Sequence, residues 1–305
     1  MKNIVIIALL IVVLGLGVWI GASSDDLALK DGQDSETEES INIKEDLEAN
    51  SERSYGSAVI TTDANYRYIS SDGLPNHETG NFPNAGNPNS ISEQDHDFKV
   101  ALNPEYKVTA TAVQLPGVAL NGIPMEPGTA EAFSNDPSTG WVSEAFVDGV
   151  GGLGIDWSNA HVQPNGTYHY HAVPQGLLES ALEDQEGDLI HLGWAADGFP
   201  IYYSQSNSYS PSYQLKSGTR PSGPGGTYDG TYTQDFEYQE GLGDLDDCNG
   251  IEIDGQYLYL ITSEFPVISR CLHGEPDPSL ASGPGPGAGA PSQQGPSQGS
   301  RPPRR

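Results

Sequence analysis

Glycine and proline interrupt the middle of this chain so often that long helices are not expected there. The chain has 305 residues, of which 37 are glycine and 23 are proline. Glycine destabilises a helix interior and proline breaks it, whereas both are common in turns between strands. The sequence therefore predicts an all-β or β-rich α+β fold, as a single sandwich- or barrel-like domain with long loops.

The clearest hairpin signal is the segment "IEIDGQYLYLIT" (251–262). Its Asp254-Gly255 pair suits a type I′ turn, because both residues tolerate a positive φ angle. Side chains alternate along the strand that follows, so Tyr257 and Tyr259 are expected on one face and the two leucines on the other. Further strands are predicted from β-branched and aromatic runs next to turn residues, at 55–62, 65–75, 106–124 and 191–204.

Only one or two short helices are expected. The segment "PQGLLESALEDQ" (174–185) carries apolar residues at helical spacing over about two turns. A second short helix is predicted at "EPGTAEAF" (126–133). Helical repeats and the Rossmann and P-loop patterns are absent from the sequence.

The N-terminus predicts export. Residues 4–22, "IVIIALLIVVLGLGVWIGA", carry no charge and approach the length of about 20 residues that spans a bilayer. Cleaved signal peptides usually have a shorter apolar core, so the length favours an uncleaved membrane anchor over a signal peptide at residues 1–22. The domain is then either anchored on the outer side of the inner membrane or secreted.

Composition divides the rest of the chain into three segments. Residues 23–54 hold 11 acidic and 3 basic residues and no aromatic, which predicts a disordered acidic stalk. Residues 277–305 are mostly Gly, Pro, Ser and Gln, which predicts a flexible tail. The segment 55–276 between them is expected to form one domain. Its 30 acidic and 6 basic residues exclude nucleic acid as a partner and suit salty surroundings, a cationic partner or a metal ion.

The two cysteines, Cys248 and Cys271, are the only ones in the chain. An even pair in an exported domain predicts a disulfide, which would stabilise the fold by roughly 3 kcal/mol in the chain-entropy model. A cysteine-based metal site is the alternative, but neither residue belongs to a CxxC pair.

The motif "NGTYHYHAVPQGLL" (165–178) places two histidines between tyrosines. Residues two apart on a strand point to one face, so His169 and His171 would share a face opposite Tyr168 and Tyr170. A turn after "NAHVQ" would bring His161 back toward them. Imidazole nitrogens bind transition metals, which predicts a copper or zinc site formed by these three histidines.

Two alternatives to a metal site remain open. The histidines would either bond to backbone and carboxylates on a polar strand face, or act in acid–base catalysis without a metal. The tyrosines are predicted to be structural, because the Gly-x-Tyr-x-Tyr pattern recurs at 255–259 without histidines. Whether the protein is an enzyme stays open, since no G-x-S-x-G nucleophile motif occurs.

Three further residues are weaker site candidates. His77 lies in a loop rich in Asn, Pro and Gly, a composition that forms turns and also lines sites. His191 begins an apolar strand, where a histidine usually has a structural role. Asp197 precedes a glycine and is expected to form a turn.

Five separate segments follow one another in the order "GLPNHETGNFPNAGNPNSISEQ", "GVALNGIPMEPGTAE", "NAHVQPNGTYHYHAVPQGLL", "GWAADGFPIYY" and "LDDCNG…FPVISRCLHG". Together they resemble the YHYH-domain family, which is named for the residues at Tyr168–His171. The resemblance implies an exported bacterial-type domain of roughly 200 residues and no settled activity.

Two functions are compatible with this sequence, a metal-binding protein at the cell surface and an extracellular binding or adhesion module. The second would recognise a carbohydrate or surface partner through tyrosines and Trp157 or Trp194, with structural histidines.

Overall fold

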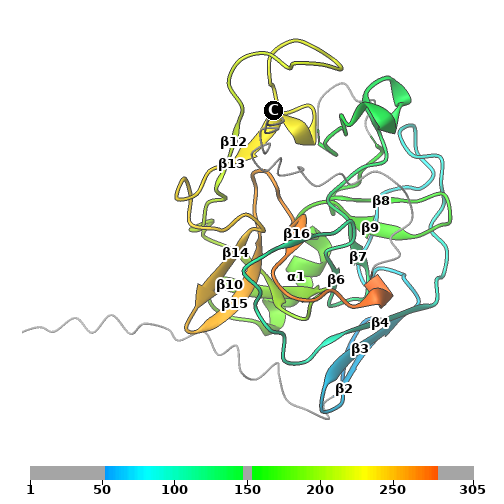
Figure 1. Cartoon of the computed structure of the whole chain (residues 1–305). Helices are drawn as coiled ribbons and strands as arrows, with labels where there is room; N and C mark the ends of the chain where they lie inside the picture. The colour runs from blue at the N-terminus through cyan, green and yellow to red at the C-terminus, as the bar shows by residue number, and fades with distance from the viewer. Residues whose placement is uncertain (1–51, 147–152, 281–305) are drawn as a thin grey trace, which may run out of the picture. The chain divides into compact units, whose positions relative to one another are not determined.

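The computed structural model describes residues 52–146 and 153–280 (Figure 1). The predicted anchor or signal peptide, nearly all of the predicted stalk and most of the predicted tail lie outside these residues. The described chain begins three residues before the predicted domain boundary at residue 55 and continues four residues beyond 276. Within the described residues, no helix has the length and apolar character needed to cross a bilayer.

An antiparallel four-stranded sheet forms the N-terminal part of the described chain. Its order is β1-β2-β3-β4, so each strand pairs with its neighbour in sequence. Alternate residues of β3 are buried, as expected for a sheet with one face on the core. The strands are β1 (Glu52–Tyr55), β2 (Ala58–Thr62), β3 (Tyr66–Ser71) and β4 (His96–Ala101).

A mixed eight-stranded sheet carries the rest of the core. Its order is β14-β15-β11-β10-β6-β7-β9-β8, and the β11–β15 and β7–β9 pairs are parallel. All seven residues of β10 are buried, so this central strand is covered on both faces. The strands are β6 (Gly117–Ala119), β7 (Pro124–Met125), β8 (Ala160–Val162), β9 (Tyr168–Tyr170), β10 (Leu189–Ala195), β11 (Pro200–Ser204), β14 (Gly250–Ile253) and β15 (Gln256–Ile261).

Two small sheets and short helices complete the described structure. One sheet pairs β12 (Tyr213–Leu215) with β13 (Phe236–Tyr238), and the other pairs β5 (Thr111–Ala112) with β16 (Cys271–Leu272). The α-helix is α1 (Gln175–Asp184), which packs on β10. The 3₁₀ helices are η2 (Phe133–Asn135), η3 (Pro137–Thr139), η4 (Thr233–Asp235) and η5 (Pro278–Leu280).

The local turn signals are confirmed. Asp254 and Gly255 have φ angles of 53° and 78° and connect β14 to β15, as a type I′ turn requires. The 191–204 segment forms the β10–β11 hairpin, and the predicted helix at 174–185 is α1. The fold is β-rich, and the described strands form open sheets rather than a closed barrel.

The helix predicted at 126–133 is wrong. The chain there is extended, because Ala132 forms a β-bridge with Val142 and the hydroxyl of Thr129 donates to the carbonyl of Ser143. A Pro-Gly pair inside the segment also disfavours a helical turn. The 106–124 segment forms only the short strands β5 and β6 and the first residue of β7.

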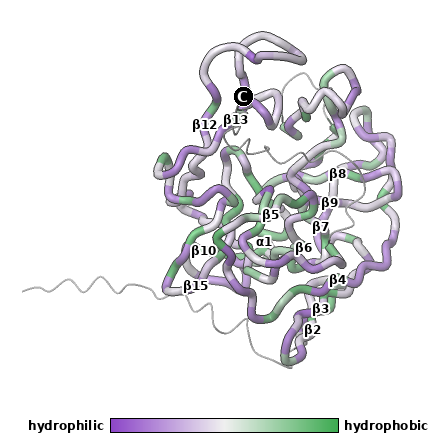
Figure 2. The backbone as a smooth tube through the Cα atoms, viewed as in Figure 1, coloured by the Kyte–Doolittle hydropathy of each residue, from purple (hydrophilic) through white to green (hydrophobic). Residues whose placement is uncertain are grey.

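Buried apolar residues from both large sheets form one main cluster. It joins Ile69 and Val100 of the first sheet to Leu192 of β10 and to Leu177 of α1. Figure 2 shows hydrophobic segments gathered around α1, β6 and β10, with hydrophilic stretches in the outer loops. The tyrosines of the YHYH motif belong to this cluster, which places the motif at the core of the domain.

Candidate three-histidine site

The β8–β9 hairpin places His161 directly opposite His169. Its turn is closed by hydrogen bonds from the Gln163 amide to the Thr167 carbonyl and from the Gly166 amide to the Gln163 carbonyl. Gly166 has a φ of 90°, a conformation that favours glycine. The predicted return of the chain between 163 and 166 is therefore confirmed, and it brings His161 next to the YHYH motif.

The three histidines of the motif region form one cluster. One side-chain nitrogen from each of His161, His169 and His171 lies within 4.8 Å of the others. The Nε2 atoms of His161 and His171 are 3.0 Å apart, and the three ring centroids are 4.6 to 4.7 Å from one another. Two ligand nitrogens about 2.0–2.1 Å from one ion at a tetrahedral angle would be about 3.4 Å apart, so this spacing suits a shared ion.

Backbone carbonyls fix the tautomer of two of these rings. The Nδ1 of His161 lies 2.7 Å from the Leu153 carbonyl, and the Nδ1 of His169 lies 3.3 Å from the Thr167 carbonyl. A carbonyl only accepts, so both Nδ1 atoms carry a proton and both Nε2 atoms keep a lone pair. A hydrogen bond from the second ring nitrogen to a backbone carbonyl is common among metal-binding histidines.

Burial keeps the cluster neutral. His169 and His171 are each 2 % exposed, and His161 is partly buried. Burial lowers the pKa of His169 to about 3 and places the pKa values of His161 and His171 below their usual range. Neutral imidazole is the form that binds a metal ion, so the three rings are ready to coordinate one at neutral pH.

A carboxylate lies beside the cluster and was not predicted from the sequence. The Oε2 of Glu126, which follows β7, is 3.8 Å from the Nε2 of His169 and accepts a 2.6 Å hydrogen bond from Gln163. Burial raises the pKa of Glu126 to about 7, against the effect of the Gln163 bond. The parallel β7–β9 pairing positions this residue, and no local pattern in the sequence signals that pairing.

The tyrosines of the motif point to the other face and are anchored there. Tyr168 and Tyr170 are fully buried, with ring centroids 5.7 Å apart. The hydroxyl of Tyr168 donates to Asp156 at 2.7 Å. The hydroxyl of Tyr170 lies 2.7 Å from His77 Nε2 and accepts from Asn121. The predicted separation of tyrosines and histidines is confirmed, and His77 lies with the tyrosines, apart from the histidine cluster.

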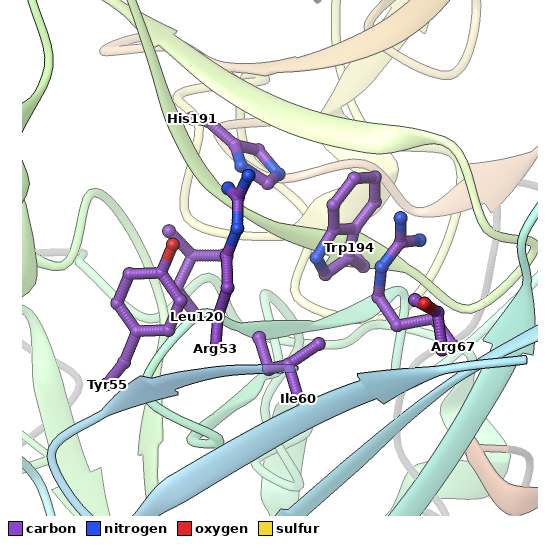
Figure 3. A pocket seen from close by; sticks show the side chains of 8 residues that line it. Arg53, Tyr55, Ile60, Arg67, Leu120, His191 and Trp194 are labelled. Carbon is purple, nitrogen blue, oxygen red and sulfur yellow. The ribbon is translucent and has the colours of Figure 1, made fainter. Parts of the chain in front are cut away.

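His191 lies in a separate small cavity of about 20 Å³ (Figure 3). Its Nε2 is 2.9 Å from the Gly193 carbonyl, and its ring packs on Trp194 at 4.4 Å. The guanidinium of Arg67 stacks on the ring of Trp194, 3.3 Å from the centre of that ring. Trp194 is 3 % exposed, so its ring is not available as a platform for a sugar.

Asp197 is a buried acceptor in the β10–β11 turn. Its carboxylate accepts hydrogen bonds from the hydroxyl of Tyr259 and from the amides of Phe199 and Gly274. Burial raises its pKa, against the effect of these bonds. The residue therefore ties the turn to β15 and to the segment after β16.

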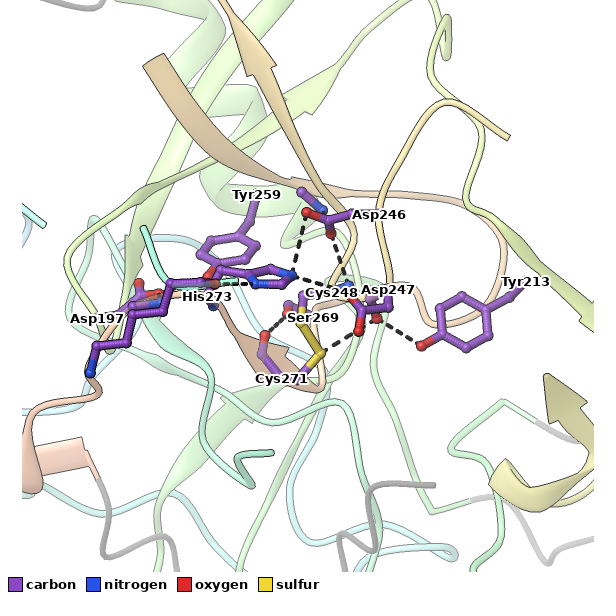
Figure 4. The surroundings of a disulfide bond; sticks show 12 residues. Asp197, Tyr213, Asp246, Asp247, Cys248, Tyr259, Ser269, Cys271 and His273 are labelled. Atoms are coloured by element: carbon purple, nitrogen blue, oxygen red, sulfur yellow. Dashed lines mark hydrogen bonds and ion pairs between the residues drawn. A yellow bond between two sulfur atoms is a disulfide. The ribbon is translucent and has the colours of Figure 1, made fainter. Parts of the chain in front are cut away.

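The disulfide between Cys248 and Cys271 is present, as predicted, and an acidic cluster lies beside it (Figure 4). Asp246, Asp247 and His273 are close enough to hold an ion. However, Nδ1 of His273 lies 2.8 Å from the Lys107 carbonyl and its Nε2 lies 2.9 Å from Asp247. Both nitrogens therefore face acceptors, and the pKa of His273 is raised because these bonds outweigh the effect of burial. Ring nitrogens that donate to these acceptors offer no lone pair to a metal ion.

The fold and the site together define a β-rich domain with a cluster of three histidines that could hold a metal ion. The sequence model of the YHYH protein family matches residues 97–274, which is more than half of the chain. The chain therefore belongs to the YHYH protein family. The match contains the eight-stranded sheet, the three-histidine cluster and the disulfide, whereas β1, β2 and β3 precede it. No curated protein and no solved structure is significantly similar to the chain.

Proposed function

We propose that the protein is an exported metal-binding protein of the cell surface, with copper or zinc held by His161, His169 and His171. The observation that carries the proposal is the convergence of three neutral imidazoles, of which two present an Nε2 lone pair to a common point. Transition metals are bound by this donor set. Export is supported by the apolar N-terminus and by the disulfide.

Hydrogen bonding alone explains the cluster less well. Because the Nε2 of His161 has no proton, a hydrogen bond between the two Nε2 atoms would require the His171 Nε2 to donate. The His171 Nδ1 would then be a buried acceptor, and it makes no hydrogen bond with any described residue. A metal ion would instead bind one lone pair of each ring and leave the His171 Nδ1 protonated, and the backbone of Pro127 interacts with this ring.

The residues around the cluster suit an ion that keeps an open coordination position. Three histidines are the protein ligands of one class of catalytic zinc site, in which the metal supplies Lewis acidity. Glu126 would hold a proton or accept a hydrogen bond beside that position, and Gln163 fixes the orientation of its carboxylate. Leu153 and Thr167 orient the rings through their carbonyls.

The proposal is tested with the full chain purified without affinity histidines and without chelator. One equivalent of copper or zinc per chain is expected, with a dissociation constant below about micromolar in a competition titration. His161→Ala should weaken binding by about a hundredfold or more, because even loss of an outer-shell partner costs 10- to 100-fold. His77→Gln is the matched control, since His77 lies with the tyrosines. Equal loss of metal in both variants, or no bound metal in the wild type, would refute the proposal.

A binding or adhesion module remains the second candidate. Trp157 is 46 % exposed, and its ring is held edge-on against His77 at 5.8 Å, so an exposed aromatic side chain is available to stack on a sugar. Trp157→Ala should abolish retention on immobilised glycans if this function holds. Retention that is unchanged by this substitution would remove the candidate.

A further inference from the structure

A cleft of about 350 Å³ lies next to the histidine cluster. It is formed where the start of β4 meets β7, the β8–β9 turn and η5. This volume is at the lower end of the range for small-molecule sites. The residues that line it are Gln94, Asp95, His96, Asp97, Phe98, Leu115, Pro124, Glu126, Gln163, Asn165, Thr167 and Ser279.

Some residues of the cleft wall also contact the histidine cluster. Glu126 lines the cleft, and its Oε2 is 3.8 Å from the Nε2 of His169. Thr167 lines it too, and the Thr167 carbonyl bonds to the Nδ1 of His169. A molecule in the cleft would therefore contact groups that directly touch the cluster.

Three acidic residues line the cleft. Asp95, Asp97 and Glu126 carry carboxyl groups, and Asp95 acts electrostatically on the neighbouring ring of His96. Carboxylate oxygens only accept hydrogen bonds. A ligand that pairs with these groups must bring N–H or O–H donors.

Charge and aromatic surface favour a cation among such donors. None of the described residues that line the cleft is lysine or arginine. The rings of His96 and Phe98, which both line the cleft, stack with centroids 5.0 Å apart and add aromatic surface to its wall. The chain has a formal net charge of −29, so its field attracts cations toward the cleft.

We infer that this cleft binds a small organic cation of the amine class and holds it against Glu126, beside the three histidines. Binding itself follows from the cleft alone. Only the second part of the inference rests on the proposed function, namely that the bound amine would lie beside a metal ion held by His161, His169 and His171.

Isothermal titration of the full chain with putrescine, spermidine and ethanolamine tests this inference, with cellobiose as a neutral probe. At least one amine should bind at low ionic strength to both chelator-treated and metal-loaded protein, and binding should weaken with salt. Asp95→Asn should weaken binding by about two- to fivefold, and Glu126→Gln by about tenfold. Asp254→Asn, in the exposed β14–β15 turn, is the charge-matched control and should have almost no effect.

Three results would overturn the inference. These are no amine binding in either form of the protein, equal weakening by Asp254→Asn, and binding of cellobiose in preference to the amines. Amine binding that persists in chelator-treated protein separates this inference from the metal proposal, because the cleft would then be occupied whether or not the histidines bind a metal.

Discussion

The Nε2 atom of His161 lies 3.0 Å from the Nε2 atom of His171, although ten residues separate them in the chain. Both rings are neutral because burial lowers their pKa values. Two unprotonated nitrogens in such contact would repel each other unless a proton or a metal ion lies between them. This relationship makes the cluster sensitive to pH and to metal, and the predictions below use that sensitivity.

The metal-free protein should lose stability as the pH falls below about 6.5, where unfolded histidines take up protons. Burial lowers the pKa values of all three cluster histidines in the folded state, that of His169 to about 3. Glu126 acts in the opposite direction, because its pKa of about 7 lets the folded state hold a proton that the unfolded state releases above about pH 4.5. The difference is therefore at most two protons, three from the histidines less one from the glutamate.

That difference corresponds to a fall in the free energy of unfolding of up to about 2.7 kcal/mol per pH unit between pH 6.5 and 4.5. Urea denaturation at a series of pH values measures it. Glu126→Gln removes the opposing group and should steepen the fall by about 1.4 kcal/mol per pH unit. A stability that stays constant down to pH 4.5 would contradict the buried, neutral state of the histidines.

Tyr168 should stabilise the fold through both its ring and its hydroxyl. Tyr168→Phe removes the bond to Asp156 and is expected to cost about 1–2 kcal/mol, whereas Tyr168→Ala should cost about 3–5 kcal/mol because the ring is fully buried. Tyr68→Phe is the matched control, since Tyr68 makes a similar bond to Asp63 on the exposed face of β3. Equal costs for the two Tyr→Phe changes, by chemical denaturation, would argue against a structural role for the motif tyrosine.

Gly166 should be required for the turn that returns His161 to the motif. Its φ is 90°, and a Cβ atom there would collide with Ser92. Gly166→Ala is therefore expected to destabilise the protein by about 1–3 kcal/mol and to weaken metal binding. Gly187→Ala is a matched control at a similar φ of 95° with open space around it, so its cost should be smaller and metal binding unchanged. Unchanged metal binding in Gly166→Ala would contradict the role given to this turn.

The disulfide should stabilise the fold without affecting the histidine cluster. Replacing Cys248 and Cys271 by serine is expected to cost about 3 kcal/mol, because the loop between them is no longer closed in the unfolded chain. Thermal denaturation with and without reductant measures the same contribution on the wild type. Loss of the bound metal in the double variant would mean that the cysteine region, rather than the histidines, holds the ion.

The sequence predicted the features that depend on neighbours in the chain. The Asp254-Gly255 turn and the approach of His161 to His169 both follow from residues within a single hairpin. The parallel pairing of β7 with β9 joins residues far apart in sequence, so the position of Glu126 beside His169 could not be predicted from local patterns. The same limit applies to Trp194, whose buried ring is stacked by Arg67 from a different sheet.

Anomalous diffraction from crystals grown with one equivalent of zinc tests the metal centre most directly. We predict one strong peak at the zinc absorption edge, about 2.0–2.1 Å from a ring nitrogen of each of His161, His169 and His171. A peak at Asp246, Asp247 and His273 instead, or no peak at the three histidines, would contradict the account.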